Sequence, residues 1–285
     1  MFTALECPGC GRPHAVEDLV CAMCGGLLRR ATPTDDPVPS PAAPDHGEPS
    51  TPIDLRASLL ALGGGALLAP VFTFTPILRY TGWFLGSLTH ETGHAAAAWL
   101  CGCPAYPAIR LDGHAAAFHQ PQQVVLALLV WAGLAWGTWA ARHRLRVAVP
   151  LAVATLLYPL LAFTWLRELA HLLAGHLGEL TFAVVFFWRA LSGGFSPSLA
   201  ERVTYGTVAW FLLGRNVALC FGLATSAAAR AEYAGNGSFG LTNDYIRVAE
   251  DVLAWSVPSV ALLMLVVSLA ALPLAALLWR TSSCR

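Results

Sequence analysis

The sequence has little charge, and neither sign is in excess. Only 12% of its 285 residues are charged, and 17 basic residues balance 17 acidic ones. Soluble domains are about one-quarter charged, so this composition, with 56% hydrophobic residues, excludes an ordinary soluble domain. The zero net charge gives no sign of a nucleic-acid-binding surface, and no nucleic-acid partner is expected. Lysine is absent, and this all-arginine usage is typical of a GC-rich bacterial genome.

Long apolar runs are abundant after residue 55. Each is close to the roughly 20 residues that cross the hydrocarbon core of a bilayer. The runs span residues 57–78, 81–101, 122–141, 147–166, 168–188, 204–229 and 253–279. The predicted fold is therefore an all-α polytopic membrane protein with about seven transmembrane helices, surrounded by lipid.

Two pairs of cysteines precede the apolar runs. Each pair has the spacing C-x2-C, and ten residues separate the pairs. The four cysteines are Cys7, Cys10, Cys21 and Cys24. Four thiolates at this spacing are typical of a tetrahedral structural zinc, which predicts a zinc ribbon over residues 1–30; two disulfides are the alternative. Such a ribbon either stabilises a segment too short to fold alone or docks a partner protein, and both readings stay open.

A proline-rich linker separates the predicted ribbon from the membrane part. Residues 31–54 contain seven prolines and cannot bury a core, so they are expected to be extended. The predicted domains are thus 1–30, 31–54 and 55–285. Because zinc thiolates persist in a reducing compartment, the N-terminus is expected in the cytosol and the protein in the inner (cytoplasmic) membrane.

Three ionisable residues lie close together inside the run 81–101. They are His90, Glu91 and His94, in the pattern H-E-x-x-H. Ionisable side chains cost roughly 2.5–3.5 kcal/mol each in hydrocarbon, so their clustering indicates a function. Residues four apart share one helical face, so both imidazoles can bind one zinc while Glu91 acts as general base. The alternative is a buried polar cluster that joins helices.

The segment "HETGHAAAAWLCG", followed by "AIRLDGHAAAF", resembles the site-2 protease family of intramembrane zinc metallopeptidases. The resemblance implies that the H-E-x-x-H helix ends on the cytosolic side and precedes a membrane-associated hairpin. The family commonly takes its third zinc ligand from an Asp in a Leu-Asp-Gly motif on a later helix. Here Asp112 follows His94 by only 18 residues in a Pro- and Gly-containing stretch. We therefore interpret Asp112 as part of a hairpin turn.

The third ligand is expected in the run 168–188, which contains Glu168, His171, His176 and Glu179. Its start and the end of the run 81–101 are predicted on one side of the membrane. At ~1.5 Å per residue, His90 and His94 lie about 18 and 12 Å below that surface. His176 and Glu179 lie about 14 and 18 Å below it, whereas His171 lies only about 6 Å down. The matching depth predicts His176 or Glu179 as the ligand, with His176 slightly favoured.

Two polar residues near the middle of the run 204–229 are also candidates. Arg215 needs a partner at that depth, and pairing with it is the alternative role for Glu179. Asn216 is a candidate for hydrogen bonding to an unwound substrate helix.

Taken together, these features predict a zinc metalloendopeptidase that hydrolyses peptide bonds in or near transmembrane segments of membrane-protein substrates. It would bind two zinc ions, one catalytic and one structural. The alternatives are a non-enzymatic zinc-binding membrane scaffold and a metal transporter or sensor.

Overall fold

A computed structural model describes residues 5–6, 13–14, 55–112, 114–193, 198–235 and 243–283. The chain divides into two units, residues 1–51 and 52–285. In the first, β1 (Leu5–Glu6) pairs antiparallel with β2 (Pro13–His14). The four predicted zinc-ribbon cysteines and the proline-rich linker lie outside the described residues, so both stay predictions.

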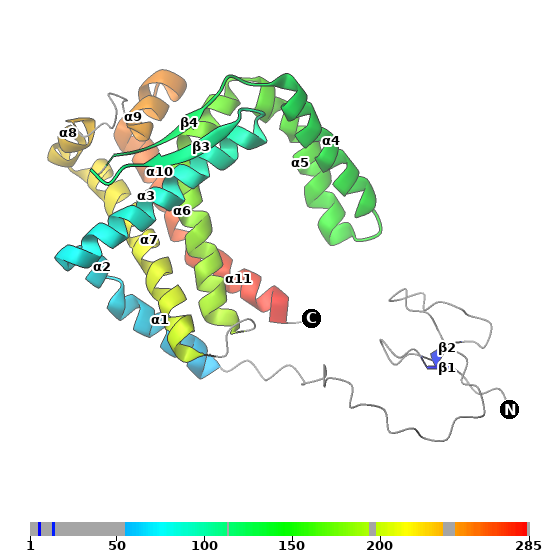
Figure 1. Cartoon of the computed structure of the whole chain (residues 1–285), viewed down its shortest axis with the longest axis horizontal. Helices are drawn as coiled ribbons and strands as arrows, with labels where there is room; N and C mark the ends of the chain where they lie inside the picture. Colours follow the sequence, from blue (N-terminus) through cyan, green and yellow to red (C-terminus); the bar gives the residue numbers. More distant parts are fainter. Residues whose placement is uncertain are drawn as a thin grey trace. The chain divides into compact units, whose positions relative to one another are not determined.

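The second unit is built from helices and one β-hairpin (Figure 1). Its elements, in chain order, are α1 (Leu55–Leu68), α2 (Val71–Phe74), α3 (Pro76–Leu100), β3 (Ala105–Ile109), β4 (Ala115–His119), α4 (Val124–Ala140), α5 (Leu145–Phe163), α6 (Leu166–Ser192), α7 (Leu199–Thr225), α8 (Ala227–Gly235), α9 (Asp244–Arg247), the π-helix η1 (Val248–Leu253), α10 (Val257–Leu269) and α11 (Ala271–Ser283).

Five stretches of the described chain are long and apolar enough to cross a membrane. They are Leu55–Phe74, Leu145–Phe163, Leu166–Ser192, Leu199–Thr225 and Val257–Thr281. The helical membrane protein expected from the sequence is confirmed, and five of the seven predicted runs form stretches long and apolar enough to cross a membrane. The count of seven stays a prediction. The other two predicted runs do form helices. Polar side chains make α3 less apolar, and α4 is apolar but has only 17 residues.

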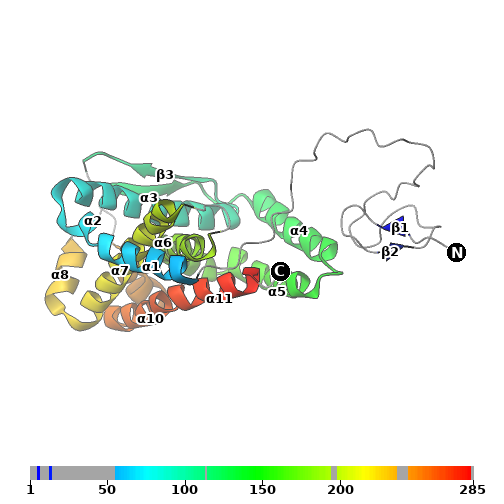
Figure 2. The same cartoon turned by 90° about the horizontal axis from the view of Figure 1, so that it is seen from below.

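Helix α6 is central, since it contacts α3, α7 and α11, while α1 and α10 pack against α7 (Figure 2). Close helix approach depends on small residues. A Cβ at Gly206 of α7 would lie 2.7 Å from the carbonyl oxygen of Ala61 in α1. Buried side chains such as Phe187 and Leu212 fill the space between α6 and α7. In a membrane, burying such side chains stabilises the helix contacts through close packing rather than through exclusion of water.

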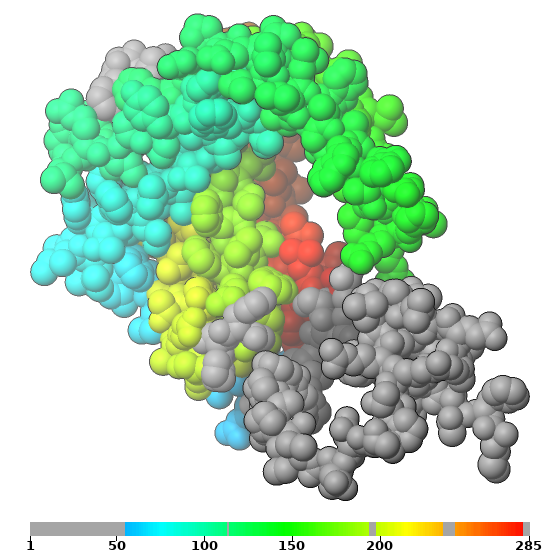
Figure 3. All heavy atoms as spheres, turned by 45° about the vertical axis from the view of Figure 1, so that its right-hand side comes forward, coloured from blue at the N-terminus to red at the C-terminus, as the bar shows by residue number. Residues whose placement is uncertain are grey.

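Helices α4 and α5 pack against each other as a green arm beside the other helices (Figures 1 and 3). Their outward side chains are large and apolar, and Trp136 and Leu156 are 69% and 77% exposed. A soluble protein seldom exposes an apolar surface of this extent. Contact with lipid accounts for it.

The β3–β4 hairpin lies along α3, which contacts both strands (Figure 2). Asp112 is in the turn between them, as expected from the sequence, and forms a 2.6 Å ion pair with Arg110. Both side chains are exposed. The hairpin places the inner part of β4 beside the polar residues of α3.

Candidate metal centre

Helices α3 and α6 cross in direct backbone contact at the level of the H-E-x-x-H residues. A Cβ at Gly93 would lie 2.1 Å from the carbonyl oxygen of Ala174, and one at Gly178 would lie 2.7 Å from the Cα of Gly93. Glycine on both helices is therefore required for this approach. The crossing brings His90, Glu91 and His94 against the polar stripe of α6.

Three acceptor atoms converge at this crossing. The Nε2 atoms of His90 and His94 are 3.1 Å apart, and the Oδ2 atom of Asp244 lies 3.2 and 3.1 Å from them, respectively. Tetrahedral zinc ligands with bonds of about 2.0–2.2 Å lie roughly 3.3–3.5 Å from one another. The triangle is within a few tenths of an ångström of that spacing.

The hydrogen-bond partner of each Nδ1 atom, on the side of the ring away from the triangle, determines the tautomer of that imidazole. His90 Nδ1 is 2.8 Å from Oε1 of Glu179, and His94 Nδ1 is 2.7 Å from the backbone carbonyl oxygen of His171. Both partners accept, so each Nδ1 carries the hydrogen and each Nε2 presents a lone pair to the triangle. Two lone pairs and a carboxylate would repel one another, and either a proton on an Nε2 atom or a metal cation between them relieves this repulsion. Metal-ligating histidines typically have such outer partners.

Glu179 is held in a network of its own. Its Oε2 atom accepts a 2.9 Å hydrogen bond from Nδ2 of Asn216 and lies 3.8 Å from Nε of Arg215. Only 1% of Glu179 is exposed. A buried carboxylate needs such partners to remain charged, and the pairing with Arg215 expected from the sequence is present. Both carboxylate oxygens are occupied, which places Glu179 behind His90 and outside the triangle.

His176 lies beside the triangle. Its ring is stacked on Tyr245 with centroids 4.2 Å apart and meets His90 edge-on at 4.6 Å. One potential metal-ligand atom from each of His90, His176 and Asp244 lies within 4.8 Å of the other two. Nδ1 of His176 is 3.1 Å from Oδ1 of Asn216. His176 therefore stays a candidate ligand at longer range than Asp244.

Asn216 does not lie on an open surface. It is 1% exposed, and its amide group donates to Glu179 and to the Leu212 carbonyl while its oxygen faces His176. These contacts use its polar atoms within the network. These contacts are those of a residue that orients Glu179 and His176, and the substrate contact predicted from the sequence stays a prediction.

Gly175 leaves space next to the two imidazoles. A Cβ built there would lie 2.4 Å from Nε2 of both His90 and His94. Any larger residue would push into the volume beside the lone pairs. The absence of a side chain at this position is an independent observation that fits an ion in the triangle.

Asp244 is the residue that the sequence analysis missed. It begins α9, outside the candidate spans, and follows His94 by 150 residues. Burial disfavours its charge, but hydrogen bonds from His90 and His94 in their protonated form outweigh this and hold the pKa of Asp244 well below its usual range. A signal existed in the sequence: a polar segment, 230–252, separates the apolar runs 204–229 and 253–279.

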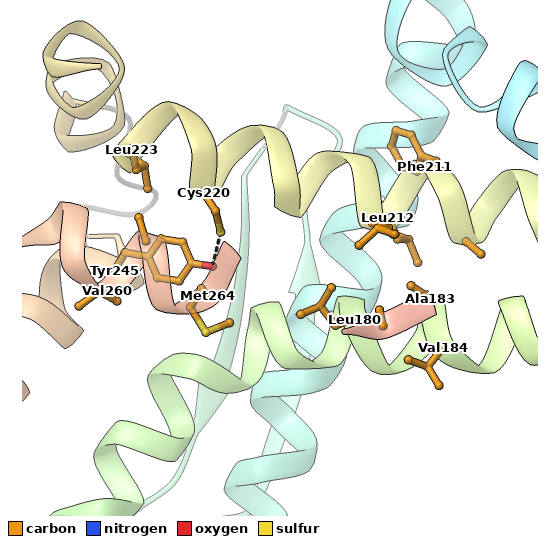
Figure 4. Close-up of a cluster of buried hydrophobic side chains, with 14 of the residues drawn as sticks. Leu180, Ala183, Val184, Phe211, Leu212, Cys220, Leu223, Tyr245, Val260 and Met264 are labelled. Atoms are coloured by element: carbon orange, nitrogen blue, oxygen red, sulfur yellow. Dashed lines mark hydrogen bonds between the residues drawn. The ribbon is translucent and has the colours of Figure 1, made fainter. Parts of the chain in front are cut away.

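Tyr245 anchors Asp244. The Tyr245 side chain is fully buried near Val260 and Met264, and its hydroxyl lies 3.5 Å from Sγ of Cys220 (Figure 4). The neighbouring Tyr245 ring thus fixes the start of α9 against α7 and α10. Because the anchor is the next residue, the Asp244 carboxylate has little freedom to leave the triangle.

Glu91 is outside the triangle but in the same cleft. Cavities of about 280 and 300 Å³ meet there, and both are lined by His90, Glu91, Ala115 and Asp244. The backbone N–H of Ala117 in β4 faces the Glu91 carboxylate. The arrangement can hold a metal on one side and a proton acceptor beside it.

No protein-family model, curated protein or solved structure matches the chain in the comparisons. The resemblance to site-2 proteases therefore stays a prediction from the sequence, and the functional argument depends on geometry.

Proposed function

We propose that the protein is an intramembrane zinc metalloprotease that cleaves membrane-protein substrates in or near their transmembrane segments. One observation carries this proposal: the triangle of His90 Nε2, His94 Nε2 and Asp244 Oδ2, with edges of 3.1–3.2 Å, opens into a cleft containing Glu91. Asp244 takes the place of third ligand, and Glu179 orients His90. The five apolar stretches support a membrane protein as the setting for this chemistry.

The roles of the protein's residues follow from their positions. When bound, zinc would polarise the scissile carbonyl and acidify the attacking water. Glu91 would accept a proton from that water and donate it to the leaving nitrogen. The Glu179 carboxylate and the His171 carbonyl would keep both imidazoles in the ligating tautomer.

The free edge of β4 supports a peptide substrate in extended form. The bond from Arg110 N to His114 O fixes the register, so the hydrogen-bonded pairs alternate from there along the hairpin. Ala115 and Ala117 fall at non-bonded positions, so their N–H and C=O groups point away from β3. The Ala117 N–H faces Glu91, which leaves the Ala115 groups and the Ala117 C=O for a peptide. On the other strand, Pro107 opposes Ala117 and has no N–H to offer. Only the cleft side of the hairpin is therefore suited to strand addition.

The Glu91→Gln variant tests the proposal. Purified protein and variant would be reconstituted with a model transmembrane substrate, and cleavage products and bound zinc would be measured together. We expect unchanged zinc content and a rate at least about a hundredfold lower. Retained cleavage would refute the protease. Zinc flux into the vesicles without cleavage would favour the transporter, and neither cleavage nor flux would favour the scaffold.

The N-terminal cysteines complete the proposal. Cys7, Cys10, Cys21 and Cys24 would hold a second, structural zinc in a cytosolic ribbon. Such a ribbon would present a surface for a partner protein or for the substrate's cytosolic tail.

A further inference from the structure

A third cavity, of about 210 Å³, continues the cleft beyond β4. It shares His119, His171, Leu172 and Arg247 with the cavity around the triangle. A peptide lying along β4 would therefore pass from Glu91 into this space. We call it the arginine cavity, because Arg167 and Arg247 line it.

Its walls combine apolar and charged surface. Leu172, Cys101 and Cys103 are buried and line one part, and Arg167, Arg247 and Glu168 line another. Arg247 is already paired, at 3.2 Å with Glu168 and at 3.7 Å with Asp251. Its charge is therefore balanced within the protein.

Arg167 is different, because its hydrogen-bond partner is neutral. Its NH1 atom donates to Oε1 of Gln122, and that amide is fixed by 2.8 Å bonds from its Nε2 to the carbonyl oxygens of Cys101 and Ala162. The described residues form several ion pairs, and none of them supplies Arg167 with a carboxylate. Among the described residues, the Arg167 guanidinium thus has no carboxylate in ion-pair contact, although Glu168 lines the same cavity and pairs with Arg247.

We propose that the arginine cavity is a substrate subsite that selects an acidic side chain of the peptide, with Arg167 as its specificity-determining residue. This inference rests on the proposed protease function and adds to it. The planar guanidinium can bind a carboxylate through two parallel hydrogen bonds. The apolar wall would pack against the methylene groups of a Glu or Asp side chain.

The register along β4 places the subsite. Ala117 faces Glu91, and His119, two residues further, lines the arginine cavity. At about 3.3 Å per residue this separation is roughly 7 Å. A strand paired with β4 would therefore present to the cavity a side chain about two residues from the scissile bond.

The test measures binding apart from cleavage. Full-length Glu91→Gln protein in detergent would be titrated with fluorescent, β-forming, C-terminally amidated peptides. One series carries a single Glu moved along the peptide, and the matched series carries Gln at the same positions. We expect Glu to bind about tenfold more tightly than Gln at one position only, and added salt to reduce the difference.

Variants assign the preference to Arg167. In the same background Arg167→Gln should abolish the preference, and Arg167→Lys should keep part of it because the charge remains. Arg146→Gln, an exposed arginine at the start of α5, is the matched control and should change nothing.

Several results would overturn the subsite: equal binding of Glu and Gln peptides, no binding of either, or a preference that survives Arg167→Gln in folded protein. The comparison of Glu with Gln needs no arginine variant, so it decides even if Arg167→Gln fails to fold. A neutral peptide with a free C-terminal carboxylate that binds as tightly would assign the cavity to chain ends instead. Cleavage of the same peptides by the protein with Glu91 intact is scored separately, so its absence counts against the protease alone.

Discussion

Replacing Gly175 with alanine would place a methyl group beside the predicted zinc. Its carbon would lie 2.4 Å from Nε2 of both His90 and His94 and 2.5 Å from Cε1 of His90. Ordinary contacts between such atoms are about 3.5 Å or more, so both imidazoles must retreat by roughly 1 Å. A ligand atom displaced by that much cannot keep a zinc–nitrogen bond of about 2.0–2.1 Å.

The expected effect on zinc is therefore large. Disturbing only an outer partner of a ligand costs about 10–100-fold in metal affinity, and this change displaces two ligands directly. We expect zinc affinity at this site to fall by at least about a hundredfold. The purified full-length protein should then contain one zinc fewer per chain. The effect on stability should be small, because overpacking costs about 1–3 kcal/mol and alanine returns about 1 kcal/mol of helix propensity.

Two comparisons show whether the loss is specific. Gly133→Ala in α4 meets nothing within 4 Å and should keep full zinc. Gly93→Ala should separate α3 from α6 and lower thermal stability along with zinc, since its Cβ would lie 2.1 Å from a backbone oxygen. If folded Gly175→Ala protein keeps its full zinc content and affinity, no metal lies between the two imidazoles and the proposed centre is wrong.

The remaining predictions concern ligand identity and the ribbon. Asp244→Ala should remove the intramembrane zinc, whereas Glu179→Gln should only weaken it by about 10–100-fold; the reverse order in a zinc titration would exchange their roles. His176→Ala should leave one zinc in the membrane part, and loss of that zinc would instead make His176 a ligand. A peptide of residues 1–30 should fold on adding one equivalent of zinc under reducing conditions, and circular dichroism that does not change with zinc would contradict the ribbon.

Local features of the site could be read from the sequence because they depend on short spacings. His90 and His94 are four residues apart and so share a helical face, and in the structure their Nε2 atoms are 3.1 Å apart. Hydrophobic length likewise predicted the helical fold. It predicted seven spans, of which five meet the length and hydropathy of a crossing helix; α3 falls short because of its polar site residues, and α4 because it has only 17 residues.

The polar residues of α6 and α7 were found, but their contacts were not. Depth along a helix brings Glu179 to the level of His90. It does not say which imidazole nitrogen the carboxylate meets. In the structure that nitrogen is Nδ1, and Glu179 is occupied further by Asn216 and Arg215. Rotations of a few tens of degrees about the helix axis decide such contacts, and the hydrophobic pattern does not fix them.

Asp244 could not be found from periodicity, since the segment that carries it has no long apolar run. Its position depends on Tyr245, whose burial between α7 and α10 is a contact between distant parts of the chain. Tyr245 must be apolar enough to be fully buried, whereas its neighbour Asp244 must be charged. An anchor adjacent to a ligand reduces the entropy lost when the ligand is ordered. For this reason a short segment outside the candidate spans can hold a carboxylate at the triangle.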